Sequence, residues 1–372
     1  MIRILHVVHG MDCGGTENII MNIYRNIDRT KVQFDFLVHT NKECFFDDEI
    51  KSLGGNIYHV CYYNMLNVLT YRRQLHDFFK SHREFSAVHG HLGSCACIYL
   101  RVARKFNLPT IAHSHAINDK QKNLKNFLYR IHAYFSRGAA DFYMGCSYEA
   151  GKDRYGRKIA DGKKFKIIKN GINASNYMFN AERRRNMRRE LSVTDRFVIG
   201  NVGRLCYVKN HSFMIDVLKE LKKTHSDSCL LLVGDGELKT DISRKAADLG
   251  LEDSVIFTGV RKDVAEVLQA MDFFIFPSFN EGLGIGLIEA QAAGLQAIAN
   301  AEGVLPSTKI TPLVEFIPIS AGPQEWATHI SESRQKDLVR QDMSDAIRNA
   351  GFDIAEVALW LQNFYCNLES AI

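Results

Sequence analysis

The sequence has no large excess of charge of either sign. Its 47 Lys and Arg residues nearly balance its 42 Asp and Glu residues, which leaves a formal net charge of +5. That charge is too small to indicate a nucleic-acid-binding protein. Long apolar runs are also missing. The longest uncharged stretch, residues 52–71, contains two glycines, a histidine and three asparagines, so we expect no membrane span. The apolar run at the start is too short for a signal peptide.

No cysteine pattern indicates disulfides. The 9 cysteines are odd in number and scattered along the chain, which favours a reduced protein in the cytoplasm. Internal repeats and low-complexity tracts are absent as well. With 46% hydrophobic and 24% charged residues, the composition is that of an ordinary globular protein. A length of 372 residues suits two domains, each with a full core.

Short apolar runs alternate with longer amphipathic ones in the first half of the chain. Residues 2–8 predict a buried parallel strand, and a turn that contains glycine leads into a predicted helix at 17–27. Further strands are predicted at 34–38, 87–91, 110–115 and 141–145. This alternation is typical of βαβ units, so we expect a parallel sheet with helices on both faces.

The same alternation starts again near residue 197, after an arginine-rich stretch. We therefore predict domains at 1–180 and 181–352, both Rossmann-like and facing each other across a cleft. The last segment, 353–372, has apolar residues at helical spacing, and we predict that this helix returns to the first domain. The strands predicted in the second half are 197–202, 230–233, 255–258, 273–277 and 297–299, and the helices are 211–223, 263–271 and 287–293.

Two carboxylates and three glycines fall within the nine residues EGLGIGLIE. Glu281 and Glu289 are separated by seven residues across a glycine turn that opens a helix. Gly282, Gly284 and Gly286 would let a ligand approach the backbone closely, and the helix N-terminus would present N–H groups to an anion. A carboxylate in the first turn can also accept two hydrogen bonds from a diol. The alternative is a plain strand–turn–helix connection with solvated glutamates.

Two cations follow another predicted strand, on the loop GRLCYVK. Arg204 and Lys209 could both reach a pyrophosphate there, Arg204 as a fork and Lys209 as a point charge, because strand ends of doubly wound sheets bind ligands. Alternatively, they are two surface cations. Gly14 and Gly15 after the first strand also permit close ligand approach. Their turn is not a GxGxxG and fits an ordinary helix cap equally well.

Two His-x-His pairs end predicted strands, His89 and His91 on one and His113 and His115 on the next. The members of each pair face the same side of the sheet, and a Cys-x-Cys pair lies nearby. This spacing matches no standard structural zinc site, and no acidic cluster accompanies it. We therefore predict no metal site but one histidine that hydrogen-bonds or exchanges protons in the cleft, the others being packed or exposed.

Residues 120–169 have a larger local excess of positive charge than the whole chain, with aromatic residues interleaved. Such a segment suits an anionic membrane surface. The alternative is a solvated helix with one face in the core. Because no nucleic-acid-binding motif is present, we expect no nucleic-acid partner.

Taken in order, these motifs resemble the retaining family 4 glycosyltransferases of the GT-B fold. The resemblance is closest to bacterial enzymes that build exopolysaccharide, capsule or lipopolysaccharide O-antigen. The E-x₇-E signature matches Glu281 and Glu289, and the G-R-x-x-x-x-K donor-phosphate motif matches Gly203, Arg204 and Lys209. Similar segments also include LLVGDGEL at 231–238, FTGVRKDV at 257–264, NGI at 170–172 and AHSH at 112–115.

The resemblance implies a role for each motif. Arg204 and Lys209 would hold the donor diphosphate, with Gly14 and Gly15 approaching it from the first domain. Glu289 would bind the ribose hydroxyls. The other implied contacts are Glu281 at the donor sugar, the amides of Gly284, Ile285 and Gly286 at the diphosphate, the backbone of Val260 and Arg261 at the base, and His115 near the reacting sugar.

The implied activity is transfer of a hexosyl residue from a nucleotide sugar, most readily a UDP-sugar, to a polyprenyl-linked oligosaccharide. The family reaction retains the anomeric configuration and needs no metal or other cofactor, since cations and helix N-termini can stabilise the leaving diphosphate. Such acceptors place the enzyme in the cytoplasm, peripheral on the inner face of the cell membrane. Two alternatives stay open: another GT-B enzyme, such as a non-hydrolysing UDP-N-acetylglucosamine 2-epimerase, and a non-catalytic sugar-nucleotide-binding protein.

Overall fold

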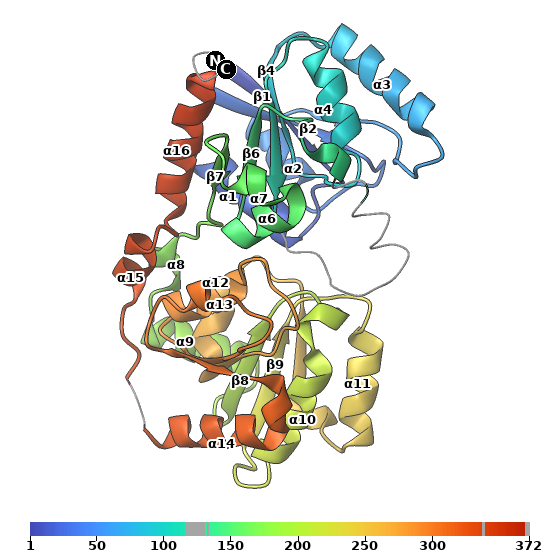
Figure 1. Cartoon of the computed structure of the whole chain (residues 1–372). Helices are drawn as coiled ribbons and strands as arrows, with labels where there is room; N and C mark the ends of the chain where they lie inside the picture. Colours follow the sequence, from blue (N-terminus) through green and yellow to red (C-terminus); the bar gives the residue numbers. More distant parts are fainter. Residues whose placement is uncertain (116–130, 132–133, 337–338, 369–372) are drawn as a thin grey trace. The chain divides into compact units, whose positions relative to one another are not determined.

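The chain folds into two units in the computed structural model (Figure 1), which describes residues 1–115, 131, 134–336 and 339–368. Unit 1 consists of Met1–Gly171 and Ile354–Ile372, and unit 2 of Ile172–Asp353. Each unit has its own parallel sheet and its own hydrophobic core.

Unit 1 contains a seven-stranded sheet of order β3-β2-β1-β4-β5-β6-β7. All of its pairings are parallel. The central strand β1 pairs with β2 on one side and β4 on the other, so the order of the strands reverses between β1 and β4. The strands are β1 (Ile2–Val8), β2 (Val32–Val38), β3 (Ile57–His59), β4 (Phe85–Gly90), β5 (Thr110–Ser114), β6 (Phe142–Gly145) and β7 (Phe165–Ile167).

Helices cover both faces of this sheet. On β1, Leu5 and Val7 pack into a core with residues of α3 and α4, whereas His6 points to the opposite face and contacts Phe34 and Phe36 of β2, as the two-residue period of a strand requires. The described helices of unit 1 are α1 (Gly15–Asn26), α2 (Asp47–Ser52), α3 (Val68–Ser81), α4 (Ala96–Arg104), α6 (Tyr148–Tyr155), α7 (Arg157–Ala160) and α16 (Ile354–Cys366).

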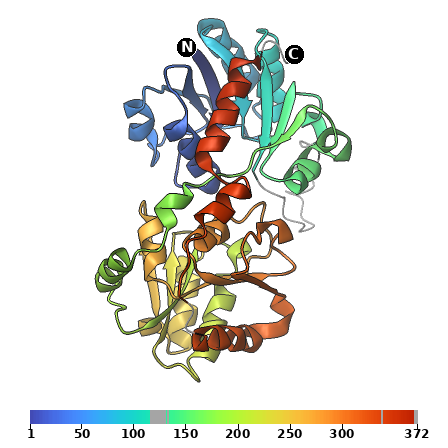
Figure 2. The ribbon, with the colours of Figure 1, turned by 90° about the vertical axis from the view of Figure 1, so that its left-hand side faces the viewer.

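The C-terminal helix α16 belongs to unit 1, which confirms the prediction that it returns to the first domain (Figure 2). It packs on α1, β1 and β2 and buries Ile354, Ala358, Leu361 and Tyr365. The backbone N–H of Asp28 donates a hydrogen bond of 2.9 Å to the side-chain oxygen of Gln362 on α16. Residues from the two ends of the chain therefore share one core.

Unit 2 contains a six-stranded parallel sheet of order β10-β9-β8-β11-β12-β13, the order of a Rossmann fold. Its order reverses between β8 and β11. The two Rossmann-like sheets confirm the predicted fold class, although β3, β7 and β13 are strands that the sequence analysis did not predict. The strands are β8 (Phe197–Val202), β9 (Ser228–Val233), β10 (Val255–Gly259), β11 (Phe273–Phe276), β12 (Gln296–Asn300) and β13 (Val314–Ile317).

The first helix of unit 2 lies before the expected domain boundary. Helix α8 (Ala174–Tyr177) packs on α12, α13 and α15, so residues 172–180 belong to unit 2 and not to the first domain. The physical reason is that Ala174 is buried there. The other helices are α9 (Ala181–Glu190), α10 (His211–Leu221), α11 (Lys239–Asp248), α12 (Val264–Ala270), α13 (Ile285–Ala292), α14 (Gly322–Gln335) and α15 (Ser344–Asn349).

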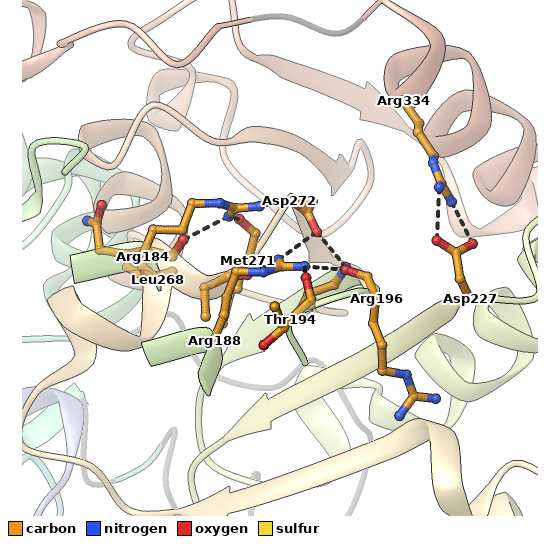
Figure 3. Close-up of polar contacts among 12 residues, drawn as sticks. Arg184, Arg188, Thr194, Arg196, Asp227, Leu268, Met271, Asp272 and Arg334 are labelled. Carbon is orange, nitrogen blue, oxygen red and sulfur yellow. Dashed lines mark hydrogen bonds and ion pairs between the residues drawn. The ribbon is translucent and has the colours of Figure 1, made fainter. Parts of the chain in front are cut away.

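The arginine-rich stretch at the expected boundary is helix α9, and two of its arginines hold it to the sheet (Figure 3). Arg184 donates to the carbonyl of Met271 at 2.8 Å and pairs with the carboxylate of Asp272. Arg188, which is buried, donates to the carbonyl of Ala270 at 2.7 Å and to Asp272 at 3.1 Å. Asp272 also accepts the backbone N–H of Val198 at 2.7 Å. The arginine side chains of α9 thus hold the helix against the residues that precede β11.

Among the described residues, no helix is both long enough and apolar enough to cross a membrane.

Candidate functional site

The loops after β8 and β11 bring two of the predicted residues of unit 2 together at the point where its strand order reverses. The Lys209 ammonium lies 2.5 Å from Oε1 of Glu281, and both side chains are mostly buried, with 20% and 11% exposed. Lys209 also lies 5.0 Å from the ring centroid of Phe276. A backbone hydrogen bond of 2.8 Å from Phe279 to Val208 joins the two loops.

Glu289 lies on α13, where the hydroxyl of Tyr177 donates to its Oε1 at 2.7 Å. Burial raises the pKa of Glu289 to about 7, while this hydrogen bond and the nearby charge of Lys209 act to lower it. Lys209, Glu281 and Glu289 therefore form one electrostatic group in unit 2. Tyr177 was missed by the sequence analysis, because a lone tyrosine more than a hundred residues away from Glu289 carries no local signal.

The glycine turn between the two glutamates has a defined geometry. Gly284 precedes α13 in the left-handed region, with φ of 67°, which favours glycine. A Cβ on Gly286 would lie 3.0 Å from the carbonyl oxygen of Val202, so this glycine allows α13 to pack against β8. The amides of Ile285 and Gly286 are in the first turn of α13, where N–H groups have no helical acceptor.

The other predicted donor residues of unit 2 are on exposed loops. Arg204 has 72% of its side chain exposed and pairs with Glu237 at 3.0 Å. Val260 follows β10 and is also exposed. Arg261 pairs with Asp263 at 2.6 Å and with Glu190 at 2.9 Å, so its side chain fastens this loop to α9. Because the Arg261 guanidinium is engaged in these ion pairs, the backbone of residues 260–261 is the part of this loop that a ligand could contact.

Gly14 and Gly15 begin α1 in unit 1. A Cβ on Gly14 would lie 2.3 Å from a carboxylate oxygen of Glu17, so Gly14 leaves room for that side chain, whose pKa burial raises. A Cβ on Gly15 would meet no atom within 4 Å. Gly15 is thus the more open of the two.

His115 directly follows β5. Its Nε2 lies 2.7 Å from Nδ1 of His91, and burial lowers the pKa of His115 to about 4. The ring is therefore neutral at physiological pH, and it belongs to a larger group of histidines in unit 1.

Two exposed aromatic rings stand beside the Lys209–Glu281 pair in unit 2. Tyr207 and Phe279 are stacked with ring centroids 5.1 Å apart, and both are exposed. They occupy the same two loops as the ion pair. The sequence analysis did not single them out, since each is an isolated aromatic residue in its own loop.

Comparison with known proteins identifies the family. One family model, described as "Glycosyl transferases group 1", matches residues 182–349, and another, "Glycosyltransferase Family 4", matches residues 13–176. The chain is 31% identical over 370 residues to "Putative glycosyltransferase EpsF" of Bacillus subtilis (strain 168), which covers 98% of this chain and 96% of that protein. The chain belongs to the family 4 glycosyltransferases.

Two more proteins are similar to this glycosyltransferase. It is 26% identical, over 58% of each chain, to the Escherichia coli "UDP-Gal:alpha-D-GlcNAc-diphosphoundecaprenol alpha-1,3-galactosyltransferase". The solved structure of Anabaena Alr3699/HepE in complex with UDP-glucose has a TM-score of 0.80, with 18% identity and full coverage of both chains. That likeness confirms the GT-B fold expected from the sequence.

Proposed function

We propose that this glycosyltransferase moves a hexosyl residue from a UDP-sugar to a lipid-linked oligosaccharide, with retention at the anomeric carbon, in the synthesis of a surface polysaccharide. The observation that carries the proposal is the group of Lys209, Glu281 and Glu289 at the strand-order reversal of unit 2, where doubly wound folds bind ligands. The E. coli relative named for a UDP-Gal donor and a diphosphoundecaprenol acceptor supports this donor and acceptor class.

The site has the charges that a nucleotide sugar requires. The Lys209 ammonium has three N–H donors, so it can keep Glu281 and still donate to a diphosphate oxygen. Arg204 would leave or share Glu237 to add a second cation, and the amides of Ile285 and Gly286 would face the same anion. Glu289 would accept hydrogen bonds from the ribose hydroxyls, held in place by Tyr177.

The chemical step needs charge stabilised on the departing diphosphate. Lys209, Arg204 and the start of α13 would supply that stabilisation. Glu281 would face the donor sugar, and His115 would approach the reacting sugar as a neutral hydrogen-bonding group. We propose that no divalent ion takes part at the diphosphate, so that added Mg²⁺ or Mn²⁺ leaves the transfer rate unchanged.

Replacement of the cations tests the donor site. Lys209→Ala and Arg204→Ala should each weaken UDP binding by roughly 10- to 100-fold in calorimetry, the effect of losing about 1.5–3 kcal/mol from a charge-assisted contact. Lys219→Ala, on the last turn of α10, is the matched control and should bind UDP normally. Unchanged affinity in both site variants would remove the donor assignment.

A product assay separates the alternatives. Incubation with UDP-sugars and a polyprenyl-linked saccharide should release UDP and lengthen the acceptor, and NMR should show the donor's anomeric configuration kept. Epimerised UDP-N-acetylhexosamine would instead identify a 2-epimerase, and UDP binding without any product would identify a non-catalytic binding protein.

A further inference from the structure

Five histidines of unit 1 meet on one face of its sheet. His6 comes from β1, His89 and His91 from the end of β4, and His113 and His115 from the end of β5; we call them the histidine cluster. They line a cavity of about 10 Å³, which is room for about one water molecule or one ion. The other walls are apolar side chains of α1 and β2, with Leu361 and Tyr365 of α16.

The imidazoles form two hydrogen-bonded chains across the strands. In the first chain, Nε2 of His91 lies 3.0 Å from Nδ1 of His6, and Nδ1 of His91 lies 2.7 Å from Nε2 of His115. In the second chain, His89 bridges the Tyr365 hydroxyl at 2.6 Å and Nδ1 of His113 at 3.1 Å. Neighbouring rings lie against one another, with the centroids of His113 and His115 4.0 Å apart.

These chains do not satisfy all of their own nitrogens. A neutral imidazole has one N–H and one lone pair, so three rings joined by two hydrogen bonds leave one N–H and one lone pair at the ends. Within the histidine cluster, three buried ring nitrogens indeed have no hydrogen-bond partner: Nε2 of His6, Nε2 of His113 and Nδ1 of His115. Each orphaned group disfavours the folded state, because its hydrogen bond to water is lost on burial without a replacement.

His39 shows that this fold can bury a histidine without such a cost. Its Nδ1 lies 2.9 Å from the carbonyl oxygen of Val8, and its Nε2 lies 2.7 Å from the Tyr71 hydroxyl. Both nitrogens are therefore satisfied. His211 in unit 2 is likewise buried with both ring nitrogens unpaired, so an unpaired nitrogen does not by itself indicate a ligand. What sets the histidine cluster apart is that five imidazoles line one cavity.

The geometry of the ring nitrogens suits a metal ion. Two sets of three histidines, His6–His89–His91 and His91–His113–His115, each have ligand atoms within 4.8 Å of one another. Neither set contains a carboxylate or a cysteine. Imidazole nitrogen suits zinc, copper, nickel and cobalt, whereas magnesium and calcium require oxygen ligands.

Hydrogen bonding distinguishes the two sets. Both nitrogens of His89 are already paired, so the first set binds an ion only by breaking the second chain, whereas the second set gives up only the contact between His91 and His115. In the second set, His113 keeps its Nδ1 contact to His89 and has Nε2 unpaired. His91 can keep its contact to His6 and turn Nδ1 to an ion. Ligating histidines usually donate their other N–H in this way.

We propose that the histidine cluster binds one imidazole-preferring transition-metal ion, of the class of Zn²⁺, Co²⁺, Ni²⁺ or Cu²⁺, with His91, His113 and His115 as its protein ligands. His6 and His89 hold the outer nitrogens of His91 and His113. Ligand nitrogens on a tetrahedral ion lie about 3.3 Å apart at the usual Zn–N length, so the 2.7 Å pair of His91 and His115 opens by a few tenths of an ångström. His91 and His115 are residues of intermediate exposure, and a water molecule would be the fourth ligand of such an ion.

Metal content, and not transfer activity, is the readout, because His115 also has a place in the proposed function. The full-length protein without a polyhistidine tag is stripped with a chelator, titrated with Co²⁺ and with Zn²⁺, and freed of loose ion by gel filtration. The wild type should retain one ion per chain by elemental analysis, and Co²⁺ should give the visible absorption of a tetrahedral site.

Single variants assign the ligands. His91→Gln, His113→Gln and His115→Gln should each lower the affinity for Co²⁺ by more than about 100-fold. His6→Gln should lower it less, by about 10- to 100-fold, which is the usual effect of removing an outer partner of a ligand. The matched control is His76→Gln, on the exposed surface of α3, which should bind like the wild type. Circular dichroism and the melting temperature show whether each variant folds. If His91→Gln does not fold, the Co²⁺ affinity of His115→Gln tests the proposal instead.

Retention of no Co²⁺ or Zn²⁺ by the wild type, or equal affinity in His115→Gln and His76→Gln, would overturn the proposal and leave a hydrogen-bonded network only. Neither result affects UDP binding by unit 2, so failure of the metal site and failure of the proposed function are distinguishable.

Discussion

Glu289 shows how burial links the protonation of one carboxyl to the stability of the fold and, under the proposed function, to donor binding. Its folded pKa of about 7 lies above the ordinary value of 4.5 because the side chain is buried. A group whose pKa is raised by folding binds its proton more tightly in the folded chain, so its contribution to stability is greatest below pH 4.5 and is lost as the pH rises towards 7. A ribose diol, which donates hydrogen bonds, would favour the ionised form.

Glu289→Gln should therefore stabilise the unliganded protein at pH 8 and weaken UDP binding. The expected gain is about 1–2 kcal/mol, reduced from the full shift because the side chain keeps some contact with solvent. It should vanish near pH 4.5, where wild-type Glu289 is protonated. Melting temperatures at the two pH values and calorimetry with UDP measure both effects.

Glu302→Gln, in an exposed turn, is the control for removing a carboxylate and should change neither quantity. A Glu289→Gln protein that is less stable than the wild type at pH 8 would show that the carboxylate is satisfied in the free enzyme.

At the scale of the elements, one carboxylate, that of Asp272, pairs with two arginines of α9. Asp272 pairs with Arg184 and Arg188 and accepts the amide of Val198, so it joins α9, β8 and the start of β11 (Figure 3). Without that charge, two partly buried guanidinium groups would keep their carbonyl acceptors but would have no carboxylate to balance their charge. The loops that carry Lys209 and Glu281 leave the other ends of β8 and β11.

Asp272→Asn should destabilise unit 2 by about 3 kcal/mol or more, as expected when one partner of a buried ion pair is lost. The comparison variant is Asp227→Asn, which breaks the more exposed pair with Arg334 at 2.9 Å and should cost about 1 kcal/mol or less. Urea unfolding followed by circular dichroism measures both. Equal effects of the two variants would contradict a packing role for α9.

Unit 1 needs both ends of the chain. Removal of residues 354–372 would expose the apolar faces of α1, β1 and β2 that α16 covers, and would remove the partner of His89. We expect this truncation to lower the melting temperature of unit 1 by many degrees while unit 2 still binds UDP. Removal of residues 369–372 alone is the control. An unchanged melting profile in the longer truncation would show that unit 1 folds without α16.

For the whole molecule, a peripheral contact with the membrane is our expectation from the basic segment 120–169. Most of its expected contact residues lie outside the described part of the chain, but Tyr134 and Phe135 within it are 64% and 51% exposed. These two rings are therefore available to lipid headgroups instead of being core residues. Attraction of Lys and Arg to an anionic leaflet contributes about 1 kcal/mol each.

The protein should float with vesicles that contain anionic lipid, float less with neutral ones, and be released near 1 M salt, where the Debye length is about 3 Å. Substitution of Lys120, Lys122, Lys125 and Arg130 by Glu should abolish flotation and leave UDP binding intact. Wild-type protein that stays in solution with anionic vesicles at low salt would assign the charge to ordinary solvated surface.

The sequence by itself determined the two parallel sheets, the returning C-terminal helix and the family, because strand periodicity and motif spacing are local properties of the chain. The structure then placed Lys209 beside Glu281, although the donor roles of both remain proposals. Only tertiary structure decided which distant residues meet: Tyr177 at Glu289, Asp272 at the arginines of α9, and His6 among the four histidines of the His-x-His pairs. Such contacts are made between strands and helices far apart in the chain, so no spacing rule reveals them. Burial, which sets the pKa of Glu289 and leaves imidazole nitrogens unpaired, likewise exists only once the chain has folded.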